Sequence, residues 1–154
     1  MVADPADIRG WQRLSDAVTT SGRIEEGDVA RLAALGVKQV VNLALDSHPE
    51  ALVDEAGKFA AAGIAYTHIP VPFDAPQEAH YEAFRAAVEA GPKPVHVHCI
   101  MNWRVSAFFY RLHRDEAGMP EAEARALMAA QWEPDAAEKP EWRVWADFIA
   151  PKAG

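Results

Sequence analysis

The run from Val37 to Leu45 constrains the fold of this chain more than any other segment. It is an almost unbroken apolar run rich in valine, which is the composition of a parallel strand covered on both faces. Such a strand needs helices on either side of its sheet, and apolar residues at helical spacing lie before and after it. We therefore expect a single α/β domain with a mostly parallel sheet of about four to five strands flanked by helices.

Apolar periodicity and turn residues divide the rest of the chain into strands and helices. Strands are predicted at about 14–20, 37–45, 64–71 and 95–99, and helices at about 28–35, 51–60, 77–90, 103–116, 121–131 and 138–149. Residues 1–11 lack periodicity and are predicted to form a loose arm of a single 1–154 domain. Because parallel sheets bind ligands at the carboxyl ends of their strands, the functional residues are expected in a loop that directly follows a strand.

Composition narrows the possible partners and cofactors. The 154 residues, half of them apolar, can bury the core of one domain, and the formal net charge of −8 argues against nucleic acid and membrane as partners. With one cysteine and no charged-then-apolar leader, a reduced, cytoplasmic protein is expected. The histidines lack the spacing of metal ligands and no Gly-rich nucleotide loop is present, so neither a metal nor an organic cofactor is predicted.

Cys99 lies where the strand Val95–Cys99 gives way to a helix. The first N–H groups of a helix have no partners within it, so this junction favours anions and also the thiolate form of a cysteine. Arg104, about one turn further on, can grip a tetrahedral oxyanion through two parallel hydrogen bonds. The segment therefore predicts a pocket for phosphate or a sulfur oxyanion. The alternative for a lone cysteine is a buried structural thiol, and for Arg104 a surface cation.

A strand ending in His-Cys, a tight loop, an Arg and a Ser at the head of a helix resembles the signature of the protein tyrosine and dual-specificity phosphatase superfamily. The resemblance covers roughly residues 14 to 149. Within that superfamily, the chain is similar to a small bacterial branch of phosphatase-like proteins. The matching segments are Thr20–Arg23, Val40–Ala44, His68–Val71 and Trp132–Pro134.

The resemblance implies roles for individual residues. Cys99 would form a phosphocysteine, Arg104 would bind the phosphoryl oxygens, and Asp74 would act as the general acid. Ser106 would donate a hydrogen bond to the thiolate, and His98 would support the loop. The expected substrate-binding set is His98, Ile100, Met101, Asn102 and Trp103, in which loop amides face the anion and the side chains of Asn102 and Trp103 line the mouth.

Simpler structural roles remain open for several of these residues. Asp74 is equally well placed as an N-cap or turn residue before the next helix. The Ser106 hydroxyl could instead bond a carbonyl one helical turn back. Trp103 fits a core or rim position, and His96 fits a packed, hydrogen-bonded core histidine.

One departure from the family pattern keeps two further functions open. The family has five residues between Cys and Arg, whereas four intervene here, so Val105 stands where the family has its Arg. A four-residue gap resembles single-domain rhodaneses, in which the Cys carries a persulfide, and a sulfurtransferase is therefore the second hypothesis. The third is a pseudophosphatase that binds oxyanions without turning them over.

Overall fold

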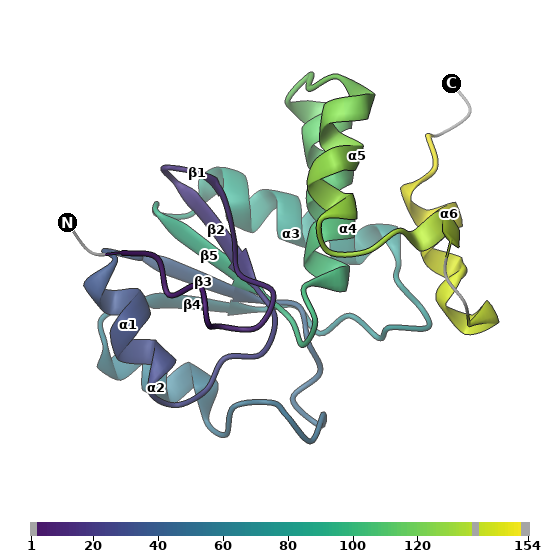
Figure 1. Ribbon diagram of the computed structural model, residues 1–154. Helices are drawn as coiled ribbons and strands as arrows, with labels where there is room; N and C mark the ends of the chain where they lie inside the picture. The colour runs from purple at the N-terminus through teal and green to yellow at the C-terminus, as the bar shows by residue number, and fades with distance from the viewer. Residues whose placement is uncertain (1–2, 137–138, 152–154) are drawn as a thin grey trace.

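The computed structural model describes residues 3–136 and 139–151 and contains one five-stranded sheet in the order β1-β2-β5-β3-β4 (Figure 1). Strands β2, β5, β3 and β4 are parallel, while β1 pairs antiparallel with β2. The predicted mostly parallel α/β fold is confirmed. The strands are β1 (Gln12–Ser15), β2 (Val18–Ser21), β3 (Gln39–Asn42), β4 (Ala65–His68) and β5 (Val95–His98).

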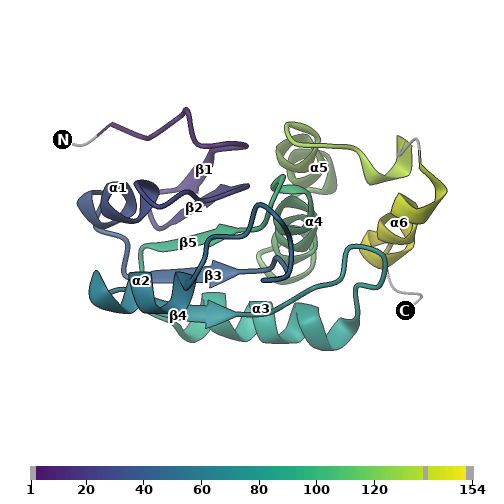
Figure 2. The same ribbon diagram turned by 90° about the horizontal axis from the view of Figure 1, so that it is seen from below.

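Helices cover both faces of the sheet (Figure 2). Val40 and Val41 of β3 point to opposite faces, and each is buried in a different core cluster. Helices α1 and α2 pack on the Val40 face, and α3 to α6 pack on the Val41 face. The helices are α1 (Asp28–Ala34), α2 (Glu55–Ala61), α3 (Glu78–Ala90), α4 (Trp103–Arg111), α5 (Glu121–Ala129) and α6 (Val144–Ile149), with a π-helical turn at Leu112–Glu116 and 3₁₀ turns at Pro134–Ala136 and Pro140–Trp142. In the described part of the chain, no helix has the length and apolar character that crossing a membrane requires.

The register of the sheet brings the loops after its strands to one edge. Ser21 of β2 and Asn42 of β3 both pair with His98, the last residue of β5, and His68 of β4 pairs with Asn42. The four parallel strands therefore end level with one another. Cys99 leaves the central strand at this edge, where ligands of such sheets bind.

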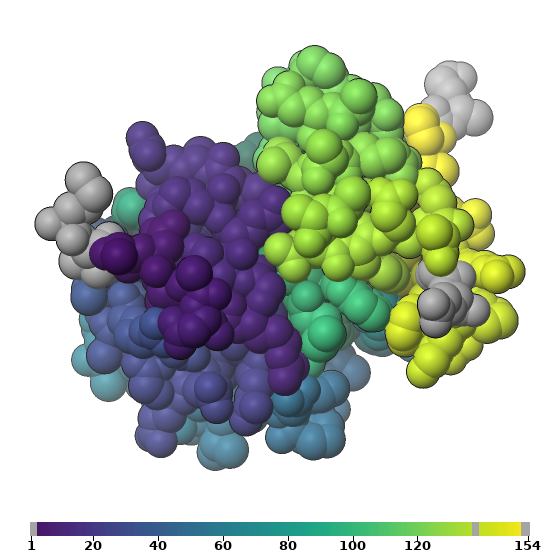
Figure 3. Space-filling view, in the orientation of Figure 1, coloured from purple at the N-terminus to yellow at the C-terminus, as the bar shows by residue number. Residues whose placement is uncertain are grey.

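The N-terminal segment corrects two predictions. The expected single strand at 14–20 is a hairpin, since β1 and β2 are joined by a turn at Asp16 and Ala17. The described part of the expected loose arm is packed against the body: Ile8 is 4 % exposed, and the Arg9 carbonyl accepts a hydrogen bond from the Gly22 amide. In Figure 3 this purple segment lies flat on the molecule. The ion pairs Arg13–Asp4, Arg31–Asp7 and Arg9–Glu50 add to these contacts, none of which a periodic pattern would reveal.

The last helix is shorter than predicted. Its expected start, Glu138, lies outside the described residues. Within them, Pro140 begins a 3₁₀ turn and the α-helix starts only at Val144. Proline has no N–H for a helical hydrogen bond, which fits the position of Pro140 at the first residue of a turn.

Candidate active site

The loop from Cys99 to Asn102, called here the Cys99 loop, connects β5 to α4. It is fixed from the side of β2: the Arg23 amide donates to the Ile100 carbonyl at 2.8 Å, and the Cys99 amide donates to the Ser21 carbonyl at 3.3 Å. A Cβ atom on Gly22 would lie 2.4 Å from the Ile100 oxygen. Only a glycine leaves room for this close approach between the two segments.

Cys99 is a free cysteine, 1 % exposed, at a pocket of about 370 Å³. Arg104 borders the same pocket. The arginine therefore reaches the cysteine's pocket although it stands one position earlier than in the family pattern. The lining residues are Leu45, Ser47, His48, Phe73, Cys99, Ile100, Met101, Trp103, Arg104 and Trp142.

The Arg104 guanidinium is buried, with the residue 6 % exposed, and has few partners of its own. Nη1 donates to the Val71 carbonyl at 2.8 Å, the group lies 5.7 Å from the centre of the Phe73 ring, and the buried Nε has no partner. Within the described chain, no carboxylate forms an ion pair with it. A buried cation with free N–H groups is stabilised by an anion that can accept from them.

The amides of the Cys99 loop supply further donors. In the described parts of the chain, the N–H groups of Ile100, Met101 and Asn102 have no acceptor. Asn102 takes a left-handed conformation, at φ +68°, as the residue before α4, whose first amides are also free of helical partners. Ile100 and Met101, whose amides are free, thus line the same pocket as Arg104 and Cys99.

One side of the pocket, the aromatic wall, consists of Phe73, Trp103 and Trp142. Trp103 stacks on Trp132 with ring centres 4.9 Å apart and planes at 4°, and meets Trp142 edge-on at 4.9 Å. Trp145 Nε1 donates to the Phe73 carbonyl at 2.6 Å. Interlocked rings therefore hold an apolar surface beside Arg104.

The two histidines of β5 lie behind the Cys99 loop. His98 is buried, with Nε2 2.5 Å from Glu55 Oε2 and Nδ1 3.2 Å from the Cys99 carbonyl. It does not line the pocket, so its position suits support of the loop and not contact with substrate. His96 is hydrogen-bonded to two hydroxyls, as predicted, and burial, followed by the nearby His98, lowers its pKa well below the usual value.

Like His98, the predicted site residues Asn102 and Ser106 do not line the pocket. Asn102 is buried and its Nδ2 donates to the Gly10 carbonyl at 2.7 Å and to Thr20 Oγ1 at 3.0 Å, so the expectation that it lines the mouth is wrong. The side-chain amide is drawn to the packed N-terminal segment, which the sequence pattern did not reveal. Ser106 Oγ donates to the Trp103 carbonyl at 3.1 Å, one turn back in α4, and not to Cys99.

Asp74 follows Phe73 in the loop between β4 and α3. Its side chain is exposed and is not among the residues that line the pocket, whereas the ring of Phe73 is. Gln77, and not Asp74, caps α3, through a reciprocal pair of side-chain bonds with His80.

Trp142 and the loop between β3 and α2 contribute to the lining but were not predicted from the sequence as parts of the site. Leu45, Ser47 and His48 border the pocket. The signal was available, since this loop follows the strand adjacent to β5 and starts at the same edge of the sheet. Within the described residues, no group of three or more His, Cys, Asp or Glu side chains could hold a metal ion.

The fold and the comparisons with known proteins together define a class, the protein tyrosine phosphatase-like phosphoester hydrolases. Residues 10–114 match the family described as "Beta-lactamase hydrolase-like protein, phosphatase-like domain", and the chain belongs to this family. The predicted relationship to the tyrosine phosphatase superfamily is thereby confirmed.

Solved structures agree with this assignment. A DUF442 protein from Shewanella putrefaciens CN-32 is 30% identical, with a TM-score of 0.76 over 93% of this chain and 90% of that chain. TpbA from P. aeruginosa, solved with phosphotyrosine, is 21% identical, with a TM-score of 0.67 over 97% of this chain and 86% of that one. The core catalytic domain of the PP-IP phosphatase SIW14 from S. cerevisiae, solved with citrate, is 12% identical, with a TM-score of 0.70 over 92% of this chain and 85% of that chain. The last two share the fold. No match is found among curated proteins.

Proposed function

We propose that this protein hydrolyses phosphomonoesters, with aryl phosphates of the phosphotyrosine type as the best fit, through a phosphocysteine intermediate on a Cys-x4-Arg loop. The observation that carries the proposal is the shared pocket of Cys99 and the buried, incompletely bonded Arg104. The aromatic wall favours a planar, apolar group on the ester, because rings gain contact area and stacking against Phe73 and Trp103. The complex of TpbA with phosphotyrosine supports the same substrate class.

The reaction follows from the residues that meet in the pocket. The Cys99 thiolate attacks phosphorus, an S–P bond forms, and the bond from phosphorus to the leaving oxygen breaks with its electron pair on that oxygen. Arg104 and the amides of the Cys99 loop hold the phosphoryl oxygens throughout. Water then attacks phosphorus, the S–P electron pair returns to sulfur, and inorganic phosphate leaves.

Two residues are proposed to serve these steps from outside the lining. Asp74 gives its carboxyl proton to the leaving oxygen and later takes a proton from the attacking water. Its place directly after Phe73, which lines the pocket, supports this role. Ser106 would donate to the Cys99 sulfur when the intermediate is hydrolysed, which requires its hydroxyl to turn away from the Trp103 carbonyl.

The proposal is tested by hydrolysis of an aryl phosphate across pH 5 to 8 under reducing conditions. Cys99→Ser is expected to abolish turnover, and Asp74→Asn to remove the decline of activity at alkaline pH. Arg104→Lys keeps the charge but loses the two-pronged grip, so kcat/KM is expected to fall roughly tenfold to a hundredfold. Turnover that persists in Cys99→Ser would refute the phosphocysteine route.

The four-residue gap between Cys99 and Arg104 keeps a sulfurtransferase as the second candidate. Thiosulfate supplied with cyanide would then give thiocyanate, dependent on Cys99. If neither reaction occurs while phosphate binds saturably, the pseudophosphatase hypothesis replaces both.

A further inference from the structure

The loop between β3 and α2 brings to the pocket a histidine that the proposed function leaves unassigned. His48 borders the same pocket as Cys99 and Arg104. Those two residues are buried, whereas His48 is exposed. It therefore lies at the mouth of the pocket.

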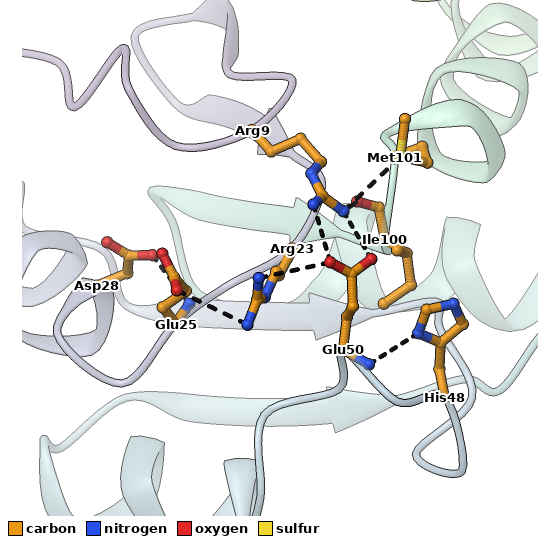
Figure 4. Close-up of polar contacts among 8 residues, drawn as sticks. All are labelled: Arg9, Arg23, Glu25, Asp28, His48, Glu50, Ile100 and Met101. Carbon is orange, nitrogen blue, oxygen red and sulfur yellow. Dashed lines mark hydrogen bonds and ion pairs between the residues drawn. The ribbon is translucent and has the colours of Figure 1, made fainter.

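The hydrogen bond at one ring nitrogen of His48 fixes where its proton lies. The Glu50 amide donates to Nδ1 at 3.0 Å. A backbone N–H can only donate, so Nδ1 must present its lone pair, and the single proton of the neutral ring is on Nε2. Nε2 has no hydrogen-bond partner within the described chain. The ring thus carries a free N–H donor, on the edge turned away from Glu50 (Figure 4).

Ion pairs tie the His48 loop to the Cys99 loop. The Glu50 carboxylate receives two hydrogen bonds from Arg9, each at 2.9 Å, and a longer one from Arg23 at 3.4 Å. Arg9 Nη1 also lies 3.4 Å from the Ile100 carbonyl (Figure 4). The backbone that presents His48 is therefore fixed relative to the loop that presents Cys99.

The Cys99 loop has one amide fewer than the five-residue pattern of the family. Only four residues stand between Cys99 and Arg104, and the Cys99 amide is already bonded to the Ser21 carbonyl. Each residue lost from a loop removes one N–H that could face an anion. A phosphoryl group has three equatorial oxygens that accept hydrogen bonds.

We propose that His48 is a catalytic residue whose Nε2–H donates a hydrogen bond to a non-bridging oxygen of the bound phosphoryl group, in place of the amide that the contracted loop lacks. The ring keeps its proton throughout, so this role leaves proton transfer to Asp74. The inference rests on the proposed function, because it concerns the same phosphoryl group.

The variant His48→Asn tests this role while keeping the loop intact. An asparagine Oδ1 can accept from the amide two residues on, as Nδ1 does here, whereas its Nδ2 donor lies closer to the backbone and does not reach the position of Nε2–H. We expect the inhibition constant for inorganic phosphate to rise roughly tenfold to a hundredfold, with a similar fall in kcat/KM for an aryl phosphate. Asp46→Asn, an exposed change in the same loop outside the pocket lining, should not weaken phosphate binding. Wild-type phosphate affinity in His48→Asn would overturn the inference.

A spectroscopic measurement separates binding from a purely structural role. In protein labelled with ¹⁵N in the imidazole rings, His48 should show the Nε2–H tautomer, and its Nε2 proton resonance should move on addition of inorganic phosphate. An Nδ1–H tautomer, or no response at saturating phosphate, would refute the inference. If Cys99→Ser abolishes turnover while His48→Asn behaves as wild type, only the His48 role fails. If the intact protein binds no phosphate and turnover is independent of Cys99, the proposed function fails with it.

Discussion

The two sides of the Cys99 pocket are built by opposite means. The aromatic wall of Phe73, Trp103 and Trp142 is held by ring stacking and by the buried Trp145 behind it. The facing side, here the polar wall, consists of the His48 loop and the ion pairs that fix it. Arg9 and Glu50 in that wall are about one third exposed, at 36% and 34% of their side-chain surfaces. The aromatic wall should therefore contribute much of the free energy of folding. The polar wall should position the His48 loop but contribute little to that free energy.

The sharpest test of this contrast is Trp145→Ala. Trp145 is fully buried, contacts Phe73, Phe108 and Trp132, and donates to the Phe73 carbonyl. Removing so large a buried ring should lower the free energy of unfolding by about 3–5 kcal/mol. Urea unfolding would measure the change, with the exposed Val53→Ala as the control, expected within about 0.5 kcal/mol of wild type. A loss in Trp145→Ala below about 1 kcal/mol would mean that the wall collapses around the gap.

An intermediate effect is expected from pH, through His96 beneath the polar wall. This ring is buried, stacks on Trp11 at 5.2 Å, and has a pKa lowered chiefly by burial and then by the neighbouring His98. The unfolded chain therefore binds more protons than the folded one below pH about 6.5. Stability should be fully present above that pH and should fall as the pH is lowered toward the folded-state pKa. His113, whose pKa is also lowered by burial, contributes with the same sign.

Urea unfolding at pH 7.5 and pH 5 would measure this dependence. His96→Gln should lower the free energy of unfolding at both pH values, because the hydrogen bonds to Thr19 and Ser21 are altered. The difference in stability between pH 7.5 and pH 5 should become smaller in this variant. An unchanged pH difference in His96→Gln would show that other groups cause it.

The smallest effect is expected from Arg9→Gln in the polar wall. An exposed ion pair contributes at most about 1 kcal/mol and is screened by salt. Its loss should therefore change the free energy of unfolding by no more than that, and the difference from wild type should shrink in 0.5 M salt, roughly five times the concentration at which the Debye length is about 10 Å. A larger, salt-independent loss would show that Arg9 acts through packing and would weaken the contrast between the two walls.

Much of the fold was predictable because local patterns and tertiary packing agree. The apolar residues Tyr81, Phe84 and Val88 place the buried face of α3 at helical spacing. Gly36 and Gly63, at φ +87° and +75°, follow α1 and α2 at the predicted ends. Val95 and Val97 alternate with histidines in β5, and all four residues are buried.

The parts that could not be predicted depend on contacts between distant segments. Asn102 turns toward Gly10, and Arg104 reaches the Val71 carbonyl, across 92 and 33 residues of sequence. Neither contact leaves a periodic or compositional trace. For His48 the strand-end position of its loop was a signal, but its place at the pocket also depends on the ion pair between Arg9 and Glu50, which leaves no such trace.

The close approach of Gly22 to the Ile100 carbonyl limits which substitutions the sequence can accept during evolution. Because a methyl group at position 22 would overlap that oxygen, a substitution there would displace a loop that lies 78 residues further along the sequence. Because that oxygen belongs to the backbone, random mutagenesis scored for activity should show few replacements at position 22, whichever residue stands at position 100. A replacement at Gly22 would survive only alongside a second change that lets the Cys99 loop retreat.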